Sequence, residues 1–278
     1  MTETRYVTYR QDGPVSHIRL NRPESYNALT LEMLTEIRAL IKKLDWQEDV
    51  RVAVISGAGR GFSSGYDIDF VAQREDYSVG HDILRNREVL DIFRDIRNSS
   101  VVTIGQIHGH CLNGGIDLCQ QFDYNIVADD AVIGCPVDRR IGATVSQMWV
   151  YHVGPQWAKY MLMTGDTIDG KTAERIGFAI KSVPEAKLEK VTDFFADRLS
   201  QVSKELLGSY KYMVNRALDL QGCSQMQDIS AEAISIANHS EEVMKDFRRL
   251  SMLGIKRLKK AVNEGYKPQL GPFEPVDE

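Results

Sequence analysis

The sequence has no long hydrophobic run. A helix that spans a membrane needs about twenty consecutive apolar residues, and a secretory signal needs a basic start followed by an apolar stretch. The opening residues, MTETRYVTYRQDG, provide neither. We therefore expect a cytoplasmic protein that makes no contact with a membrane.

The sequence also lacks an excess of positive charge. Its 34 Lys and Arg residues are outnumbered by 39 Asp and Glu residues, for a net charge of -5. Proteins contact the phosphates of nucleic acids through clustered Lys and Arg, so we expect no nucleic-acid partner. Cysteine is scarce as well, and the four cysteines lack the paired spacing of a zinc site. We expect buried, reduced thiols and no metal at Cys111, Cys119, Cys135 and Cys223.

What is present is the pattern of a layered α/β protein. The composition, 43% hydrophobic and 26% charged over 278 residues, indicates one main domain with an appendage. Apolar runs of strand length alternate with helical patterns, which favours a core with several parallel strands. Thr30 is a good N-cap for a helix whose apolar face recurs at three- and four-residue steps. The predicted strands are a hairpin around Asp12-Gly13-Pro14 and the runs 52–56, 101–107 and 124–128.

From about residue 155 the pattern changes to helices in succession. We expect a main core over residues 1–200 and a C-terminal helical region over 201–278. The predicted helices are 31–44, 81–97, 114–121, 155–163, 169–176, 185–203, 205–219 and a last amphipathic stretch with Val243, Phe247, Leu250 and Leu258.

Two glycine-rich segments follow predicted strands. In the first, GAGRGFSSGYDI, the glycines at 57, 59 and 61 have the wrong spacing for a dinucleotide fingerprint, and no GK[ST] of a P-loop is present. In the second, GHCLNGGIDL, Gly114 and Gly115 stand at the predicted start of a helix. Free amides there can point at an anionic atom, although two glycines also simply allow close packing.

Taken together, the two segments resemble the crotonase superfamily, also called the enoyl-CoA hydratase/isomerase family. NRPESYNAL is similar to the entry motif of that family, and MLMTGDTIDGKTAERIGF is similar to a later one. The resemblance runs from about residue 6 to 182. It implies a spiral of ββα units, an acyl-CoA substrate with coenzyme A as part of that substrate and no other cofactor, and a helical tail that forms a homotrimer or a dimer of trimers.

The resemblance also implies an oxyanion hole. In the family, one amide of this hole belongs to the residue after the glycine of F-x-x-G-x-D, which here is Tyr66. The other belongs to the middle of a glycine turn, which here is Gly114. Asn113 replaces the first glycine of that turn, and asparagine tolerates left-handed backbone better than most residues. Losing one such donor typically slows an enzyme about a hundred- to a thousand-fold.

The proton-transfer residues depart from the hydratase pattern. Asp117 occupies the place of the first catalytic glutamate, and a carboxylate there can move a proton at the acyl group. The place of the second glutamate falls on Val137, which cannot transfer a proton, and Asp138 can replace it only if the loop is shifted by one residue. A salt bridge with Arg139 or Arg140 is the alternative role of Asp138.

The remaining site residues carry the coenzyme or line the pocket. The resemblance places the coenzyme against Ser25, Tyr26 and Ala28 and along Phe62, Ser63 and Ser64, with Val137 facing the substrate. His81, Tyr77, Ser146 and Gln147 are polar candidates for the pocket that we expect to be surface or packing residues.

We therefore predict an enzyme that acts on acyl-CoA, most simply a lyase, with an isomerase also possible. A hydrolase or a member that cleaves carbon-carbon bonds is the first alternative. The second is a silent CoA-binding or scaffolding protein.

Overall fold

The computed structural model describes residues 5–67, 78–142 and 145–251. A sheet of six strands forms its centre, in the order β1-β2-β3-β4-β6-β9, and a sheet of three strands, β5-β7-β8, lies beside it. The hairpin β1-β2 is antiparallel, and the pairs from β2 to β9 are parallel. The strands are β1 (Val7–Asp12), β2 (Val15–Leu20), β3 (Val52–Gly57), β4 (Val102–Ile107), β5 (His110–Leu112), β6 (Tyr124–Ala128), β7 (Val132–Gly134), β8 (Thr167–Ile168) and β9 (Lys181–Val183).

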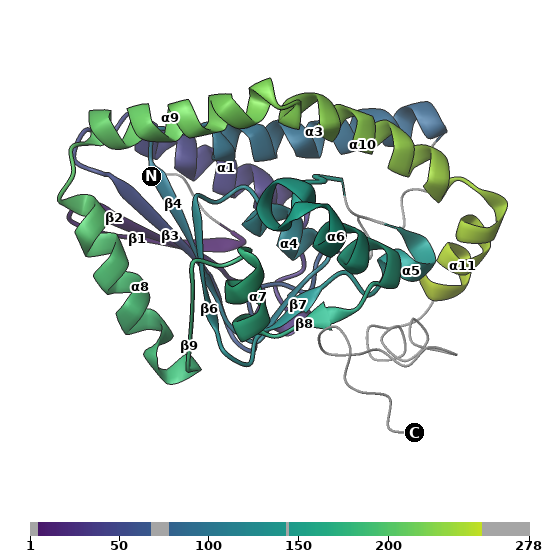
Figure 1. The fold of residues 1–278 in the computed structure, drawn as a ribbon, viewed down its shortest axis with the longest axis horizontal. Coiled ribbons are helices and arrows are strands. Elements are labelled where there is room, and N and C mark those ends of the chain that lie inside the picture. The colour runs from purple at the N-terminus through teal and green to yellow at the C-terminus, as the bar shows by residue number, and fades with distance from the viewer. Residues whose placement is uncertain (1–4, 68–77, 143–144, 252–278) are drawn as a thin grey trace.

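Helices cover the large sheet and extend beyond it (Figure 1). Helix α8 packs across strands β2, β3, β4, β6 and β9, while α1 packs on α3 and α3 on α10. The helices are η1 (Pro23–Ser25), α1 (Leu31–Asp45), α3 (Val79–Arg97), α4 (Gly114–Cys119), α5 (Asp138–Ile141), α6 (Trp149–Thr164), α7 (Gly170–Ile176), α8 (Glu185–Ser200), α9 (Lys204–Leu220), α10 (Cys223–Asn238) and α11 (Glu241–Ser251).

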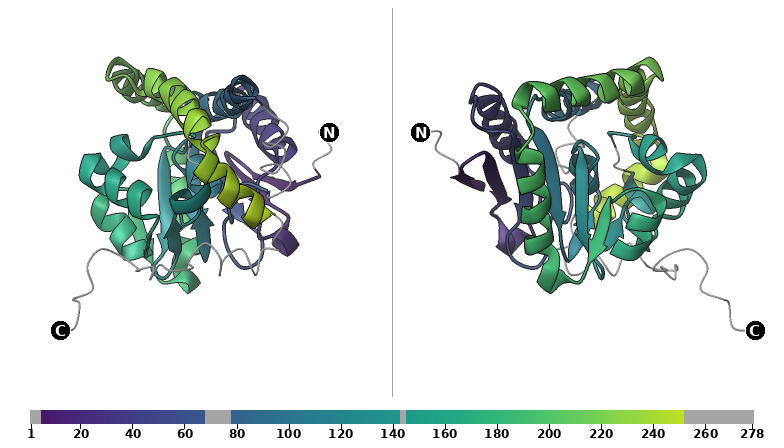
Figure 2. Two further views of the ribbon diagram at one scale, coloured as in Figure 1. Left: turned by 90° about the vertical axis from the view of Figure 1, so that its right-hand side faces the viewer. Right: turned by 60° about the vertical axis from the view of Figure 1, so that its left-hand side comes forward.

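The chain repeats a ββα path through the two sheets. Strand β4 lies in the large sheet, β5 in the small sheet, and α4 follows. Strands β6 and β7 make the same step before α5. The predicted α/β spiral is therefore confirmed, and the two further views show the helices packed around it (Figure 2).

The helix after Thr30 forms for the reasons that its sequence indicates. The Thr30 side chain accepts a hydrogen bond from the Met33 amide, which satisfies one of the unpaired amides of the first turn. Leu34, Ile37, Ile41 and Leu44 are all fully buried. Because these side chains form one face of α1, the helix is fixed to the core by that face.

Two helical predictions need correction. Helix α6 begins at Trp149 and is kinked at Gly154, where φ is +76°, so the helix predicted at 155 is its second half. Helix α10 lies where no helix was predicted. Its buried residues include Gln227, Ser230 and Ser235, so the face that packs inward carries no apolar repeat for the sequence to reveal.

The division into a core and a C-terminal helical region at residue 200 stays a prediction, and a break between two helices falls there. Helix α8 ends at Ser200 and α9 begins at Lys204. Val243 and Phe247 lie on α11, where Phe247 is buried, and Leu258 lies outside the described residues. All four cysteines are buried and reduced, as expected. None of the helices in the described ranges has the length and apolar character that crossing a membrane requires.

Candidate functional site

The two glycine-rich segments lie side by side, although about fifty residues separate them in the chain. Ser63 pairs with Cys111 as in a parallel sheet. The Ser63 amide donates to the His110 carbonyl at 3.1 Å, and the Leu112 amide donates to the Ser63 carbonyl at 2.9 Å. The Asn113 side chain then donates to the Ser64 carbonyl. This ladder holds the residues after Ser63 against the start of α4.

Glycine is needed here because the two backbones approach so closely. A Cβ atom on Gly65 would lie 2.7 Å from the Cβ of Asn113, and one on Gly114 would lie 2.8 Å from the ring of Tyr66. Gly65 also has a φ of +108°, which L side chains rarely adopt. Asn113 has a φ of +49°, so the turn keeps its positive φ with asparagine in place of glycine.

The hydrogen bonds to Leu29 use the residues on either side of Tyr66 and not the Tyr66 amide. Leu29 pairs with Tyr66 through hydrogen bonds from the Leu29 amide to Gly65 and from the Asp67 amide to Leu29. Since successive amides of an extended chain alternate in direction, the Tyr66 amide points away from Leu29. Gly114 is the first residue of α4, and its amide donates no hydrogen bond within the described ranges.

Asp117 lies on the same short helix as Gly114 and is fully buried. Its Oδ1 accepts a hydrogen bond from the Ser146 hydroxyl at 2.7 Å and from the Ser146 amide at 3.3 Å. Its Oδ2 accepts from the Tyr66 hydroxyl at 3.0 Å and from the Val145 amide at 3.4 Å. Four donors from two other segments therefore compensate for the burial of this carboxylate.

Burial nevertheless raises the pKa of Asp117 from 3.8 to about 6, because the hydrogen bonds from Ser146, Tyr66 and Val145 offset only part of the desolvation. A carboxyl group with this pKa is ionised at neutral pH and still within reach of protonation. It is therefore suited to both accept and release a proton near physiological pH.

The raised pKa predicts a pH dependence of stability. The folded state holds the Asp117 proton more tightly than the unfolded chain, so the group favours folding below pH about 4, and this contribution is lost as the pH rises through about 6. The difference corresponds to ~3 kcal/mol. Urea unfolding of the wild type and of Asp117→Asn, measured at pH 4 and pH 7, is expected to show the wild type losing stability relative to the variant. A constant difference would contradict the prediction.

The sequence matches the model of a known family. The match to "Enoyl-CoA hydratase/isomerase" covers residues 10–263. The chain belongs to this family. A hydroxycinnamoyl-CoA hydratase-lyase of Pseudomonas fluorescens is 29% identical over 217 residues, which are 76% of this chain and 78% of that protein. The resemblance to the crotonase superfamily is thereby confirmed.

Solved structures of this enoyl-CoA hydratase/isomerase family match the fold. A Mycobacterium smegmatis enoyl-CoA hydratase superposes with a TM-score of 0.87 at 29% identity, covering 94% of this chain and 93% of that one. An enoyl-CoA hydratase/isomerase from Xanthobacter autotrophicus Py2 has a TM-score of 0.87 at 27% identity, covering 95% and 100%. Membership of the family implies an acyl-CoA substrate, and the names of the relatives, which include a hydratase-lyase, indicate more than one reaction.

A catalytic role for Asp138, in place of the second glutamate of the hydratases, remains a prediction for this protein. Val137 and Asp138 lie at the start of α5, and both are partly buried. Asp138 is not among the residues that bond to Asp117 in the described ranges. Arg139 lies 4.0 Å from Asp166, and Arg140 lies 3.5 Å from Asp246. Both arginines therefore have carboxylate partners other than Asp138.

The residues predicted to bind the coenzyme come from two segments that lie next to each other. Tyr26 and Asn27 both have positive φ, and the buried Asn27 side chain donates to the carbonyls of Ala58 and Gly61. The Ser64 amide donates to the Tyr26 carbonyl, so the turn at residues 25–28 and the segment 62–64 are neighbours. This arrangement is compatible with the predicted coenzyme site.

The side chains in this region differ in what they can offer a ligand. Phe62 and Ser63 have no exposed surface, and Ala28 is 6% exposed. The Ser63 hydroxyl donates to the Asn27 carbonyl. Phe62 and Ser63 therefore offer no surface to a coenzyme in this structure, whereas Ser25, Tyr26 and Ser64 are partly exposed.

Sequence reasoning underestimated Ser146, which was expected on the surface or in packing. The structure places it, fully buried, between Asp117 and Gln120, whose Oε1 it contacts at 2.8 Å. Its neighbour Gln147 is partly buried with a φ of +45°, and His81 is exposed. Tyr77 lies outside the described residues. No local pattern marked Ser146, because its contact to Asp117 spans 29 positions of the chain.

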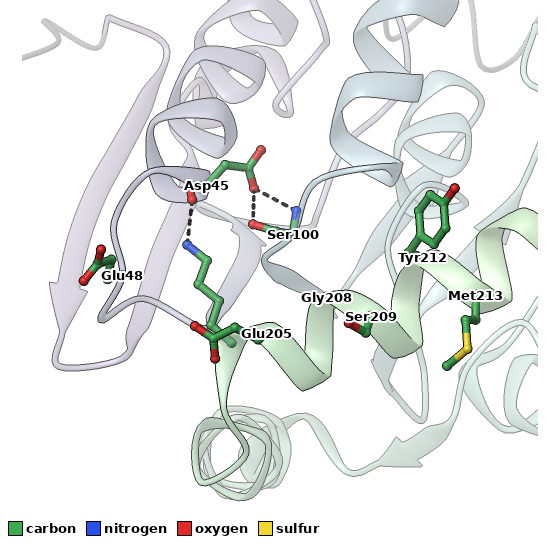
Figure 3. Close-up of a pocket in the computed structure, with 9 residues that line it drawn as sticks. Asp45, Glu48, Ser100, Glu205, Gly208, Ser209, Tyr212 and Met213 are labelled. Atoms are coloured by element: carbon green, nitrogen blue, oxygen red, sulfur yellow. Dashed lines mark hydrogen bonds between the residues drawn. The ribbon is translucent and has the colours of Figure 1, made fainter.

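An open cavity lies away from the candidate site, and the polar groups that line it have structural roles. It has a volume of about 740 Å³ and lies between the end of α1 and α9 (Figure 3). The Lys204 ammonium group donates to the carbonyls of Leu44, Asp45 and Gln47 at 2.8 Å each. It thereby caps the last turn of α1. The Asp45 carboxylate accepts from Ser100, so these polar groups join elements of the fold.

Proposed function

We propose that the protein transforms an acyl-CoA thioester by stabilising negative charge on its carbonyl oxygen with the amides of Tyr66 and Gly114. The observation that carries this proposal is the position of Asp117. A buried carboxyl group with a pKa of about 6 lies one turn of helix from Gly114 and is bonded to Tyr66. Charge stabilisation and proton transfer would therefore act on the same acyl group.

The proposed chemistry begins with the thioester carbonyl between the two amides. Removing a proton from the α carbon moves the electron pair of the C–H bond into an enolate, whose oxygen carries the charge that the amides stabilise. The reverse step returns a proton to carbon. Backbone amides and side chains supply this chemistry, and coenzyme A enters as part of the substrate.

The fate of the enolate distinguishes the candidate reactions. Hydration in this family uses two acidic side chains, and Val137 stands at the second position. One carboxylate is enough for a double-bond shift, and retro-Claisen cleavage or thioester hydrolysis also proceeds through the same charged oxygen. We place a lyase first, because the P. fluorescens relative is named a hydratase-lyase. Isomerase, hydrolase and carbon-carbon cleaving activities are the alternatives.

A panel of saturated, enoyl, 3-oxo and cyclic acyl-CoA thioesters tests the proposal. We expect turnover of at least one class, or exchange of its α hydrogen for deuterium in deuterium oxide, measured by mass spectrometry against an enzyme-free control. Binding of acyl-CoA without turnover or exchange of any member would overturn the proposal and favour a silent CoA-binding or scaffolding protein. Asp138→Asn, assayed on the same panel, tests whether Asp138 takes part.

The assembly is also a proposal. The homotrimer or dimer of trimers implied by the family resemblance has support in the exposed apolar side chains of α9 and α10, because large exposed apolar patches commonly mark protein interfaces. Sedimentation of the full chain measures the assembly, and a monomer would contradict it. The exposed side chains are Leu206, Tyr210, Met213, Val214, Ile229 and Ile236.

A further inference from the structure

The carboxylate of Asp117 cannot contact a bound ligand directly in this structure, because it is buried. It has no exposed surface, and of the three residues that bond to it, Ser146 is fully buried and Val145 is 5% exposed. Tyr66 is the one of the three that has part of its surface exposed, although its hydroxyl group is buried. A proton that passes between Asp117 and a substrate along these contacts must therefore pass through the Tyr66 hydroxyl.

The ring of Tyr66 lies where an acyl group held by the proposed amides would be close to it. Its own backbone supplies one of the two proposed oxyanion donors. Its ring covers the residue that supplies the other, since a Cβ on Gly114 would lie 2.8 Å from Cδ2 and Cε2 of the ring. The hydroxyl at the end of this ring lies 3.0 Å from Oδ2 of Asp117. The phenol therefore stands between the oxyanion donors and the buried carboxylate.

We propose that, within the function proposed above and resting on it, the Tyr66 phenol carries the proton between the α carbon of the acyl group and Asp117. In the forward step the phenolic oxygen forms a bond to the α hydrogen as the C–H electron pair becomes the enolate. At the same time the phenolic proton moves to Oδ2 of Asp117. Tyr66 ends as a phenol, Asp117 is protonated, and the reverse step returns the proton to carbon. Tyr66 is then the residue that touches the reacting atoms, and Asp117 acts through it.

The charges around Tyr66 favour this coupled transfer over a free phenolate. Burial, the charge of Asp117 and the hydrogen bond to Asp117 raise the pKa of Tyr66 well above 10.0, and Arg85 of α3 opposes this shift. Cys135, which follows β7, adds to it. Because the phenolate is disfavoured, Tyr66 can give up its proton to Asp117 only as it gains another. Ionised Asp117 is required for the forward step, so its rate should rise with pH through about 6.

Tyr66→Phe tests the relay, because it removes the hydroxyl and keeps the ring over Gly114. The readout is α-deuterium exchange on the same thioester panel, with acyl-CoA affinity measured by calorimetry. We expect exchange to be slower by at least about a hundred-fold, since positioned acid-base groups contribute about 10²–10⁴, with affinity nearly unchanged. Combining it with Asp117→Asn should add little, because the two groups act in series.

Tyr160→Phe is the matched control. The Tyr160 hydroxyl also donates to a buried carboxylate, Asp166, at 3.0 Å, so this variant loses the same kind of bond outside the site. We expect it to exchange at the wild-type rate. If Tyr66→Phe fails to fold, 3-fluorotyrosine at position 66 keeps ring and hydroxyl and makes the phenol more acidic. If Tyr66 relays the proton, the exchange rate and its pH profile change with 3-fluorotyrosine. If Tyr66 only packs against its neighbours, both stay as in the wild type.

The outcomes separate this proposal from the function on which it rests. Wild-type protein that neither turns over nor exchanges any thioester overturns the proposed function and the relay together. Wild-type exchange with an undiminished rate in Tyr66→Phe overturns the relay alone. A loss confined to acyl-CoA affinity also overturns the relay, because it assigns Tyr66 to substrate packing.

Discussion

Asp117→Asn is expected to slow turnover of the acyl-CoA substrate by about 10²–10⁴-fold while leaving acyl-CoA affinity nearly intact. The amide is close in size to the carboxylate, and its oxygen can keep the bonds that Ser146 donates to Oδ1. The Tyr66 hydroxyl can accept as well as donate, so it can face the new amide nitrogen. What the variant loses is a group that can accept a proton. Steady-state kinetics on the substrate found in the panel measures the effect.

Asp166→Asn provides the control for this substitution. Asp166 is 5% exposed and accepts a hydrogen bond from Tyr160, so the change removes a buried carboxylate outside the site. Its turnover should stay near that of the wild type. An Asp117→Asn variant with an unchanged rate would remove Asp117 from the mechanism. The pH profile supplies a further check, because the rise in rate through pH about 6 should disappear in Asp117→Asn.

The largest expected effect on stability comes from Lys211→Met. Lys211 lies on α9, and its buried ammonium group contacts Oδ2 of Asp123 at 2.7 Å and the Val101 carbonyl at 2.9 Å. The same carboxylate oxygen accepts from the amide and hydroxyl of Thr103 on β4. Methionine fills a similar space without the charge and leaves Asp123 without its cation. Removing one partner of a buried ion pair costs about 3–5 kcal/mol, which urea unfolding at neutral pH measures.

Lys42→Met tests whether burial is the cause of the large loss of stability expected for Lys211→Met. Lys42 contacts Asp95 at 2.8 Å, but its side chain is 49% exposed, and Arg38 contacts the same carboxylate. Water already screens this pair, so we expect a loss of at most about 1 kcal/mol. Similar losses in the two variants would contradict the argument that burial makes the ion pair between Lys211 and Asp123 strong.

The fold was predictable where each element carries its own pattern. The run at 52–56 is a buried central strand because its residues are apolar on both faces, and α1 shows its buried face as a repeat of leucine and isoleucine. The strands β5, β7, β8 and β9 have two or three residues each, too short to show a period. Helix α10 stayed hidden because it packs through Gln227, Ser235 and Asn238 while Ile229 and Ile236 are exposed.

The candidate site also contains residues that the sequence predicted and features that it did not. Tyr66, Gly114 and Asp117 were predicted from the family resemblance, whose motifs contain glycines that the structure places at close backbone contacts. The burial of Phe62 and Ser63 and the inward position of Ser146 were not foreseen. Each depends on a neighbour that folding brings from elsewhere in the chain. A single residue type carries no information about such a neighbour.

By itself, the sequence determined the α/β class, the two turns and the family, because these depend on periodicity and on glycines that the backbone requires locally. Only the tertiary structure decided how the Asp117 carboxylate is held. It buries the group completely, supplies Ser146 and Val145 from a loop 28 or 29 residues away, and sets the Tyr66 hydroxyl 51 residues away against it. The pKa of a carboxyl group follows from its desolvation and its donors, and those exist only once the chain has folded.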